Sequence, residues 1–150
     1  MYSRILVATD GSELADKGVE AGLALARALA ARVVLVTASE PWQDIYPGDP
    51  NGMALSSGLR DDYRKSKQVD CERILAQAQT RAKALGIDAV ETVYVADRMA
   101  ADAILETAEA RGADLIVMAS HGRSGLRKLL LGSQAQAVVS RGTLPVLVVR

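Results

Sequence analysis

The chain has 150 residues, of which 49% are hydrophobic and 24% are charged, and its 18 basic side chains balance its 18 acidic ones. This length and apolar content predict one globular domain over residues 1–150 and argue against a disordered chain. No run of about eighteen apolar residues occurs, so we expect no membrane-spanning helix. The balanced charge provides no overall basic field, and we therefore expect no nucleic-acid partner.

The N-terminus indicates where in the cell the protein is expected, and the numbers of cysteines and histidines limit the disulfides and metal sites that it can form. The first residues run directly into an apolar stretch, without a signal-type apolar region or a cleavage site, so we expect a cytoplasmic protein. The single cysteine, Cys71, leaves no internal disulfide and no paired-cysteine metal site. With one histidine in the whole chain, a zinc site is not expected.

The first part of the chain predicts a strand, a helix and a second strand. Residues 5–8 are a short apolar run. Apolar residues at helical spacing follow it, namely Ala15, Val19, Leu23, Ala26 and Leu29. Asp10 and Ser12 are both candidate caps for this helix. Residues 33–36 are β-branched or apolar without alternation, as in a strand covered on both faces.

An irregular segment and a long helix come next. Residues 39–59 contain prolines and glycines throughout, so we expect a loop of roughly twenty residues, a length at which loops are commonly functional or mobile. Residues 61–84 predict a helix, with Gly86 at the expected C-terminal position. Its apolar stripe comprises Cys71, Ile74, Leu75, Ala78, Ala82 and Leu85. The position of Cys71 on this stripe favours a core residue over a redox sensor.

The second half of the chain predicts three more strands and two helices. We expect strands over 90–95 and 114–118 and a last strand from Pro145 to Val149. A helix over 100–110 places Ile104 and Ala108 inward, and the apolar positions of a shorter, later helix are Ala135, Val138 and Val139. Strands that alternate with helices predict a doubly wound α/β fold, with a parallel sheet and helices on both faces.

Small and polar residues follow the first and fourth predicted strands. In a sheet of order 3-2-1-4-5 these two strand ends are neighbours at the switch point, where parallel sheets bind ligands. Nine residues separate Gly122 from Gly132, and Gly132-Ser133 stands where the last helix is expected to begin. Backbone N–H groups, a hydroxyl and the helix dipole meet there, which favours a phosphate. Neither a Walker loop nor a GxGxxG fingerprint is present.

Three motifs together make the chain similar to the universal stress protein family. They are the run Ser120-His121-Gly122-x9-Gly132-Ser133, the opening residues 5–12 and the closing residues 145–149. The resemblance covers the whole chain. It implies a Rossmann-like, five-stranded parallel sheet of order 3-2-1-4-5 and a stress-response protein that binds ATP with Mg²⁺ or Mn²⁺.

The resemblance also implies roles for residues at the strand ends. In ATP-binding members the motif reads Gly-x-x-Gly-x9-Gly-Ser/Thr, which carries Gly122, Gly132 and Ser133 over to the phosphates. Asp10 is then expected beside the ribose or the metal, and the backbone near Thr37 against the adenine. The candidate binding residues are Thr9, Asp10, Thr37, Met118, Ala119, His121, Gly122, Arg123, Gly132 and Ser133.

Several of these residues also have a purely structural interpretation. Ala119 stands where the ATP-binding members have glycine, and its Cβ costs about 1–2 kcal/mol if the position needs a positive φ or a close backbone approach to the ligand. No carboxylate or nucleophile stands beside His121 in the motif, so we expect a loop residue and not a general base. Arg123 faces the phosphates or is solvated. Met118 and Met99 are interpreted as packing residues.

Three functional classes stay open at this stage. The favoured one is a nucleotide-binding regulatory or signalling module with at most slow ATP hydrolysis. The second is a universal stress protein that binds no nucleotide and acts through protein partners. The third, an adenylating enzyme, needs a Ser-Gly-Gly-x-Asp-Ser loop after the first strand, where this chain has Thr9-Asp10-Gly11-Ser12. The strand from Pro145 to Val149, an edge in the expected order, predicts a homodimer because no lysine interrupts it.

Overall fold

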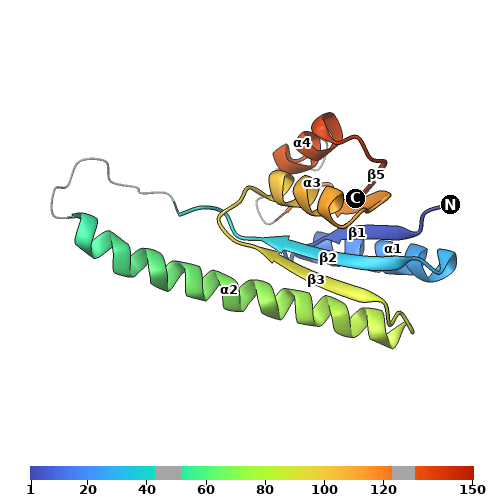
Figure 1. The fold of residues 1–150 in the computed structure, drawn as a ribbon, viewed down its shortest axis with the longest axis horizontal. Coiled ribbons are helices and arrows are strands. Elements are labelled where there is room, and N and C mark those ends of the chain that lie inside the picture. Colours follow the sequence, from blue (N-terminus) through green and yellow to red (C-terminus); the bar gives the residue numbers. More distant parts are fainter. Residues whose placement is uncertain (43–51, 123–130) are drawn as a thin grey trace.

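In the computed structural model, which describes residues 1–42, 52–122 and 131–150 and only the backbone of 52–57, the strands form one parallel sheet. The strands are β1 (Arg4–Ala8), β2 (Arg32–Ala38), β3 (Val90–Val95), β4 (Leu115–Ala119) and β5 (Val146–Val149). The helices are α1 (Glu13–Leu29), α2 (Gly52–Ala84), α3 (Ala100–Ala110) and α4 (Ser133–Arg141). The strand order is β3-β2-β1-β4-β5, which confirms the predicted order 3-2-1-4-5 (Figure 1).

Helices cover both faces of the sheet, as expected for a doubly wound fold (Figure 1). Alternate residues of the central strands point to opposite faces, so that Ile5 and Val7 pack with α1 and α2 while Leu6 packs with α3 and α4. Because both faces are buried, β1 and β4 are apolar without alternation. None of the helices in the described part of the chain has the length and apolar character needed to cross a membrane.

The expected boundaries of the last two strands shift by one residue. Asp114 lies just before β4, and its carboxylate accepts hydrogen bonds from the N–H groups of Ser3 and Arg4 at 2.7 and 3.0 Å. The Ser3 hydroxyl donates a third hydrogen bond to it at 2.7 Å. Burial by itself raises the pKa of Asp114, but these hydrogen bonds outweigh it and the pKa lies below its ordinary value. Pro145 precedes β5, and its carbonyl accepts the N–H of Ile116.

Helix α2 begins earlier than its composition indicates. The prediction of a loop up to residue 59 is wrong, because the helix starts at Gly52. The last proline of the segment is Pro50, so no residue beyond it removes a backbone N–H from the helix. Gly58 within the helix costs only about 1 kcal/mol relative to alanine. The remaining part of the predicted loop, residues 43–51, lies outside the described residues.

Three apolar residues predicted to pack inward are exposed. Leu85 lies beyond the end of α2, which stops before Gly86 at a φ of +75°. Val139 is exposed because α4 turns only Ala135 and Val138 toward the core. Met99, expected to pack, instead occupies the N-cap position of α3 and is exposed. Cys71 is buried, as predicted.

Candidate functional site

The carboxyl ends of β1, β2 and β4 meet at one level of the sheet. Ala8 pairs with Val36 and Val7 pairs with Val117, so the register places Thr9 between Thr37 and Ala119. The N–H of Thr9 donates to the carbonyl of Val36 at 3.0 Å, which continues the ladder beyond β1. These three candidate residues are all buried. The switch point between β1 and β4 therefore lies where the sequence predicts it.

The turn after β1 is held by its own side chains. The Oδ1 atom of Asp10 accepts the N–H of Ser12 at 3.0 Å, and the N–H of Gly11 donates to the Thr9 hydroxyl at 3.2 Å. The Ser12 hydroxyl in turn accepts the N–H of Ala15 at 3.2 Å, so that Ser12 is the cap of α1. Of the two candidate caps, Ser12 caps the helix while Asp10 closes the turn.

The turns after β1 and β4 contact each other through Asp10 and Gly122. A Cβ placed on Gly122 would lie 2.5 Å from the Oδ2 atom of Asp10. Real Cβ atoms do not approach an oxygen so closely. While Asp10 keeps its place, only glycine therefore fits at position 122. The two residues that the family motif carries to the ligand are thus direct neighbours.

Gly132 brings the start of α4 back to the end of β4. Its N–H donates to the carbonyl of Ser120 at 2.8 Å, and a Cβ on Gly132 would lie 3.0 Å from the same oxygen. Gly132 is the N-cap of α4 and Ser133 is its first residue, so the free N–H groups of the first turn lie beside Ser120. Arg123 and its basic neighbours Arg127 and Lys128 lie outside the described residues.

His121 is fixed by its two neighbours in this turn. Its Nδ1 atom lies 3.1 Å from the hydroxyl of the buried Ser120, within hydrogen-bond distance. A Cβ on Gly132 would lie 3.5 Å from the His121 ring, so the ring packs over the glycine. This placement fits a loop residue that borders a ligand.

Ala119 and Met118 differ in the sheet face that they present. Ala119 pairs with Val149 as the last residue of β4 and has extended backbone geometry, so a strained, positive φ does not apply to it. A Cβ on Gly18 of α1 would lie 3.3 Å from the Ala119 nitrogen, so Ala119 lies directly under α1. Met118 is buried among the residues that pack with α3 and α4, which confirms its packing role.

The carboxylate of Asp10 is the one metal ligand that the motif implies. Among the described residues, no three His, Cys, Asp or Glu side chains form a cluster that could hold a metal by themselves. A hard divalent cation at Asp10 would therefore need further oxygen ligands, from water or from a bound phosphate chain. The position of Asp10 against the turn that leads to α4 fits such a cation between carboxylate and phosphate.

Comparison with protein families decides the identity. The model of the universal stress protein family matches residues 1–150. The chain belongs to this family. A universal stress protein of Thermus aquaticus is 35% identical over 152 residues, covering 100% of both chains.

Two solved structures show the same fold across the family. The structure of protein MJ0577, from Methanocaldococcus jannaschii, has a TM-score of 0.81 and 25% identity, covering 99% of this chain and 96% of that one. A universal stress protein in complex with cAMP has a TM-score of 0.71 and 29% identity, covering 99% of this chain and 97% of that one. The Rossmann-like α/β fold implied by the resemblance is confirmed.

Sequence reasoning missed an aromatic contact beyond the carboxyl end of β2 in this universal stress protein. The rings of Trp42, after β2, and Tyr63, on α2, lie edge to face with centroids 5.1 Å apart. The Tyr63 hydroxyl donates to the carbonyl of Glu40 at 3.4 Å. Burial, followed by the charges of Glu40 and Asp97, raises the pKa of Tyr63. A single tyrosine such as Tyr63 on a charged helix forms no periodic pattern from which this contact could be predicted.

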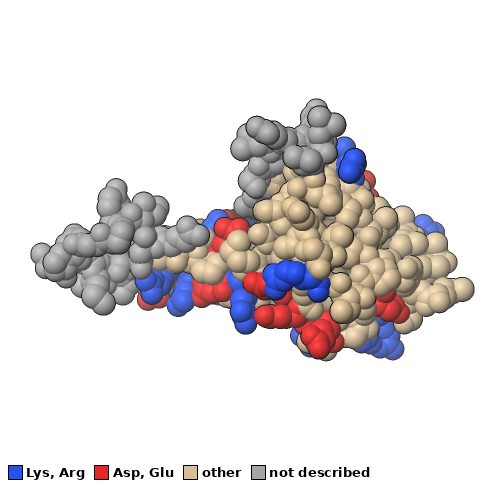
Figure 2. Space-filling model, turned by 90° about the horizontal axis from the view of Figure 1, so that it is seen from above, with Lys and Arg blue, Asp and Glu red and all other residues tan. Residues whose placement is uncertain are grey.

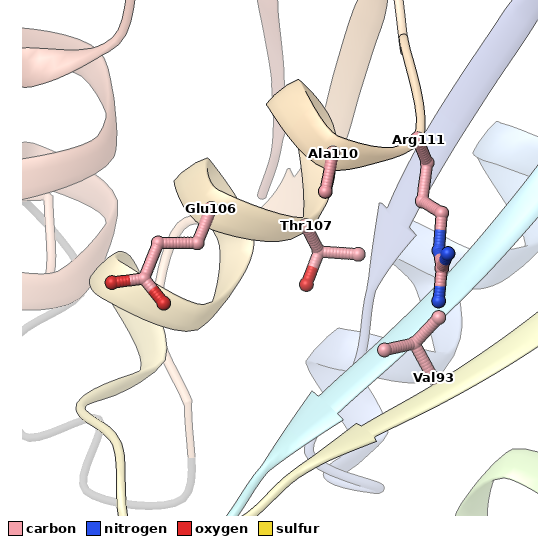
Figure 3. Close-up of a pocket in the computed structure, with 5 residues that line it drawn as sticks. All are labelled: Val93, Glu106, Thr107, Ala110 and Arg111. Carbon is pink, nitrogen blue, oxygen red and sulfur yellow. The ribbon is translucent and has the colours of Figure 1, made fainter.

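A cavity of about 220 Å³ lies elsewhere, between the edge strand β3 and α3 (Figure 3). Val93 and Thr107 face it, and Glu106 and Arg111 stand at its sides (Figure 3). Arg111 forms an ion pair with Glu91 at 2.8 Å. On the face of the molecule shown in Figure 2, acidic and basic side chains lie next to one another, mostly in the middle and lower part of the view, and a large part of that face carries neither. None of the residues that line this cavity is a candidate binding residue, so it is separate from the Asp10–Gly122 contact and from the start of α4.

Proposed function

We propose that the chain is a regulatory or signalling module that binds ATP, together with Mg²⁺ or Mn²⁺, between the ends of β1 and β4. The contact between Asp10 and Gly122 carries this proposal, because it brings a carboxylate to the turn that leads to the α4 N-terminus. A metal-bound phosphate chain needs both a carboxylate for the cation and N–H donors for the anion.

Each part of the nucleotide has a proposed partner. The free N–H groups of the first turn of α4, from Ser133 onward, bind the phosphates beside Gly132, where the helix dipole favours negative charge. Asp10 holds the cation or the ribose. The backbone at Thr37 faces the adenine, and Thr9 and Ala119 form the floor between these ends. His121 borders the phosphates. The binding role of Arg123 stays a prediction, because this residue lies outside the described part of the chain.

A relative supports a nucleotide ligand in this fold. The universal stress protein that is 29% identical was solved in complex with cAMP, an adenine nucleotide with one phosphate. ATP carries two further phosphates. The α4 N-terminus offers them partial positive charge, and the Asp10 carboxylate attracts the Mg²⁺ that they carry. ATP with Mg²⁺ is therefore expected to bind more tightly here than cAMP.

The experiment is calorimetric titration of the purified chain with ATP in Mg²⁺, in Mn²⁺ and in EDTA, with cAMP as the comparison. Gly132→Val is the test variant, because its Cβ would lie 3.0 Å from the Ser120 carbonyl. Gly58→Val is the matched control, because no atom lies within 4 Å of a Cβ at that position. We expect binding by the wild type and the control and none by a folded Gly132→Val. Unchanged affinity in the folded Gly132→Val variant would show that the site lies elsewhere.

A second candidate function is a universal stress protein without nucleotide that works through protein partners. The observation that favours it is Ala119, which replaces the first glycine of the ATP-binding motif. Nucleotide released by heating the purified protein would exclude this alternative. No released nucleotide and no titratable affinity would favour it. Any hydrolysis of ATP is proposed to be slow, because no carboxylate or nucleophile stands beside His121 in the motif to make it a general base.

We also propose a homodimer through β5. This strand is an edge of the sheet, pairs with β4 along its inner side, and leaves Leu147 40% exposed. An apolar edge strand with open N–H and C=O groups readily pairs with another chain. A twofold axis would place β5 antiparallel to the same strand of a second copy.

A further inference from the structure

Helix α2 contacts the turns that follow three of the strands. Beyond β2, the Tyr63 hydroxyl donates to the Glu40 carbonyl, and beyond β3, Arg64 forms an ion pair with Asp97 at 2.8 Å. The contact with the turn beyond β1 is made by Ile74. In Figure 1, α2 runs along β2 and β3 and continues past the carboxyl ends of the strands.

The burial of Ile74 has an unusual source. Ile74 and its neighbour Leu75 are equally buried, each with 5% of its surface exposed. Leu75 belongs to the core between α1, α2 and the sheet, whereas Ile74 belongs to neither core cluster. Its side chain instead closes on Gly11, where a Cβ would lie 2.8 Å from Cγ1 and 2.9 Å from Cδ1 of Ile74. Ile74 therefore packs against the backbone of the β1 turn.

Gly11 links Ile74 to the carboxylate of Asp10. Its φ of +75° places it at the apex of the turn that Asp10 closes onto the N–H of Ser12. The same carboxylate group lies against Gly122 through its Oδ2 atom. We therefore expect a shift of Gly11 into the space of Ile74 to disturb the placement of the Asp10 carboxylate beside Gly122.

We propose that Ile74 is a positioning residue that holds the Asp10 carboxylate in place for the cation of the bound nucleotide. The inference rests on the proposed function and adds a residue that the motif does not contain. Groups that orient a metal ligand typically change metal affinity by about 10-fold to 100-fold when they are lost. The effect of Ile74 should thus fall on the Mg²⁺-dependent part of ATP affinity.

The test compares Ile74→Ala with Leu75→Ala. Both variants remove the same number of carbon atoms from equally buried, adjacent positions on α2. For each variant and for the wild type, we would measure the dissociation constant for ATP in Mg²⁺ and in EDTA, and the urea midpoint. We expect the affinity gain from Mg²⁺ to fall by about tenfold or more in Ile74→Ala and to persist in Leu75→Ala, although the latter loses a core contact.

The outcomes separate the inference from the proposed function. A wild type that binds no ATP overturns both. A wild type that gains affinity from Mg²⁺, with the same gain in Ile74→Ala, overturns the inference alone. An equal loss of the gain in both variants also overturns it, because general loosening of α2 then suffices. If Ile74→Ala does not fold, Ile74→Val removes only the δ-methyl carbon beside Gly11, and a smaller loss in the same direction is expected.

Discussion

The carboxylate of Asp10 lies against the backbone of Gly122, with Oδ2 only 2.5 Å from the point that a glycine Cβ would occupy. Asp10 follows β1 and Gly122 follows β4, so the contact crosses the switch point of the sheet. It joins the residue proposed for the cation to the turn proposed for the phosphates. The position of either residue therefore constrains the other.

The first prediction tests this contact. Gly122→Ala should lower ATP affinity by about tenfold or more, because the new methyl group displaces the Asp10 carboxylate. The companion variant Asp10→Ala removes the obstructing carboxylate, so Gly122→Ala should have a much smaller effect in that background. Calorimetry on the four proteins of this double-mutant cycle measures the coupling. Additive effects would contradict a direct contact.

The second prediction concerns Ala119. Its extended geometry within β4 removes the strain that a positive φ would impose, so Ala119→Gly should leave ATP affinity within about twofold. The glycine should instead lower the free energy of unfolding by about 1 kcal/mol, because it gives the unfolded chain more backbone entropy, which is lost when the strand forms. Calorimetry and urea unfolding check the two parts. A tenfold gain in affinity would show that the alanine Cβ obstructs the ligand.

The third prediction concerns the pH dependence of stability through Asp114. Its hydrogen bonds from Ser3 and Arg4 lower its pKa, so its contribution is present above the unfolded-state pKa and is lost as pH falls through the folded-state pKa. Asp114→Asn should therefore reduce the free energy of unfolding at pH 7 by about 1 kcal/mol, a partly exposed group being screened by solvent. Urea unfolding of both proteins should show that this difference shrinks in acid. A difference that stays constant between pH 7 and the acid limit would rule out the carboxylate as its source.

The fourth prediction concerns the β5 edge. Light scattering of the wild type at micromolar concentration should give the mass of a dimer. Val148→Lys should shift the mass toward the monomer, because a twofold contact places the two new charges close together. Arg150→Lys, a change that keeps the charge at the chain end, is the control. A monomeric wild type would contradict the proposed dimer, and an unshifted Val148→Lys dimer would place the interface on another surface.

Apolar periodicity and capping residues predicted those strands and helices whose bounds depend on neighbouring residues in the chain. The strand over 90–95 and the helix over 100–110 have the bounds that apolar periodicity indicates. Ser12 caps α1 because a hydroxyl at that position satisfies a free N–H within the same turn. The start of α2 was missed because the prolines and glycines of residues 41–58 indicate a loop, whereas the helix begins soon after the last of these prolines, Pro50.

The sequence by itself determined the order of the elements and, through its motif, which residues belong to a common site. It did not determine their neighbours. An apolar stripe on α2 predicts that Ile74 and Leu75 are buried, but both satisfy the same periodicity, and only the packing of α2 places Ile74 on Gly11 and Leu75 in the core. The Asp10–Gly122 contact likewise arises only when β1 and β4 become adjacent, because contacts between distant segments depend on how the sheet is assembled and leave no local pattern in the chain.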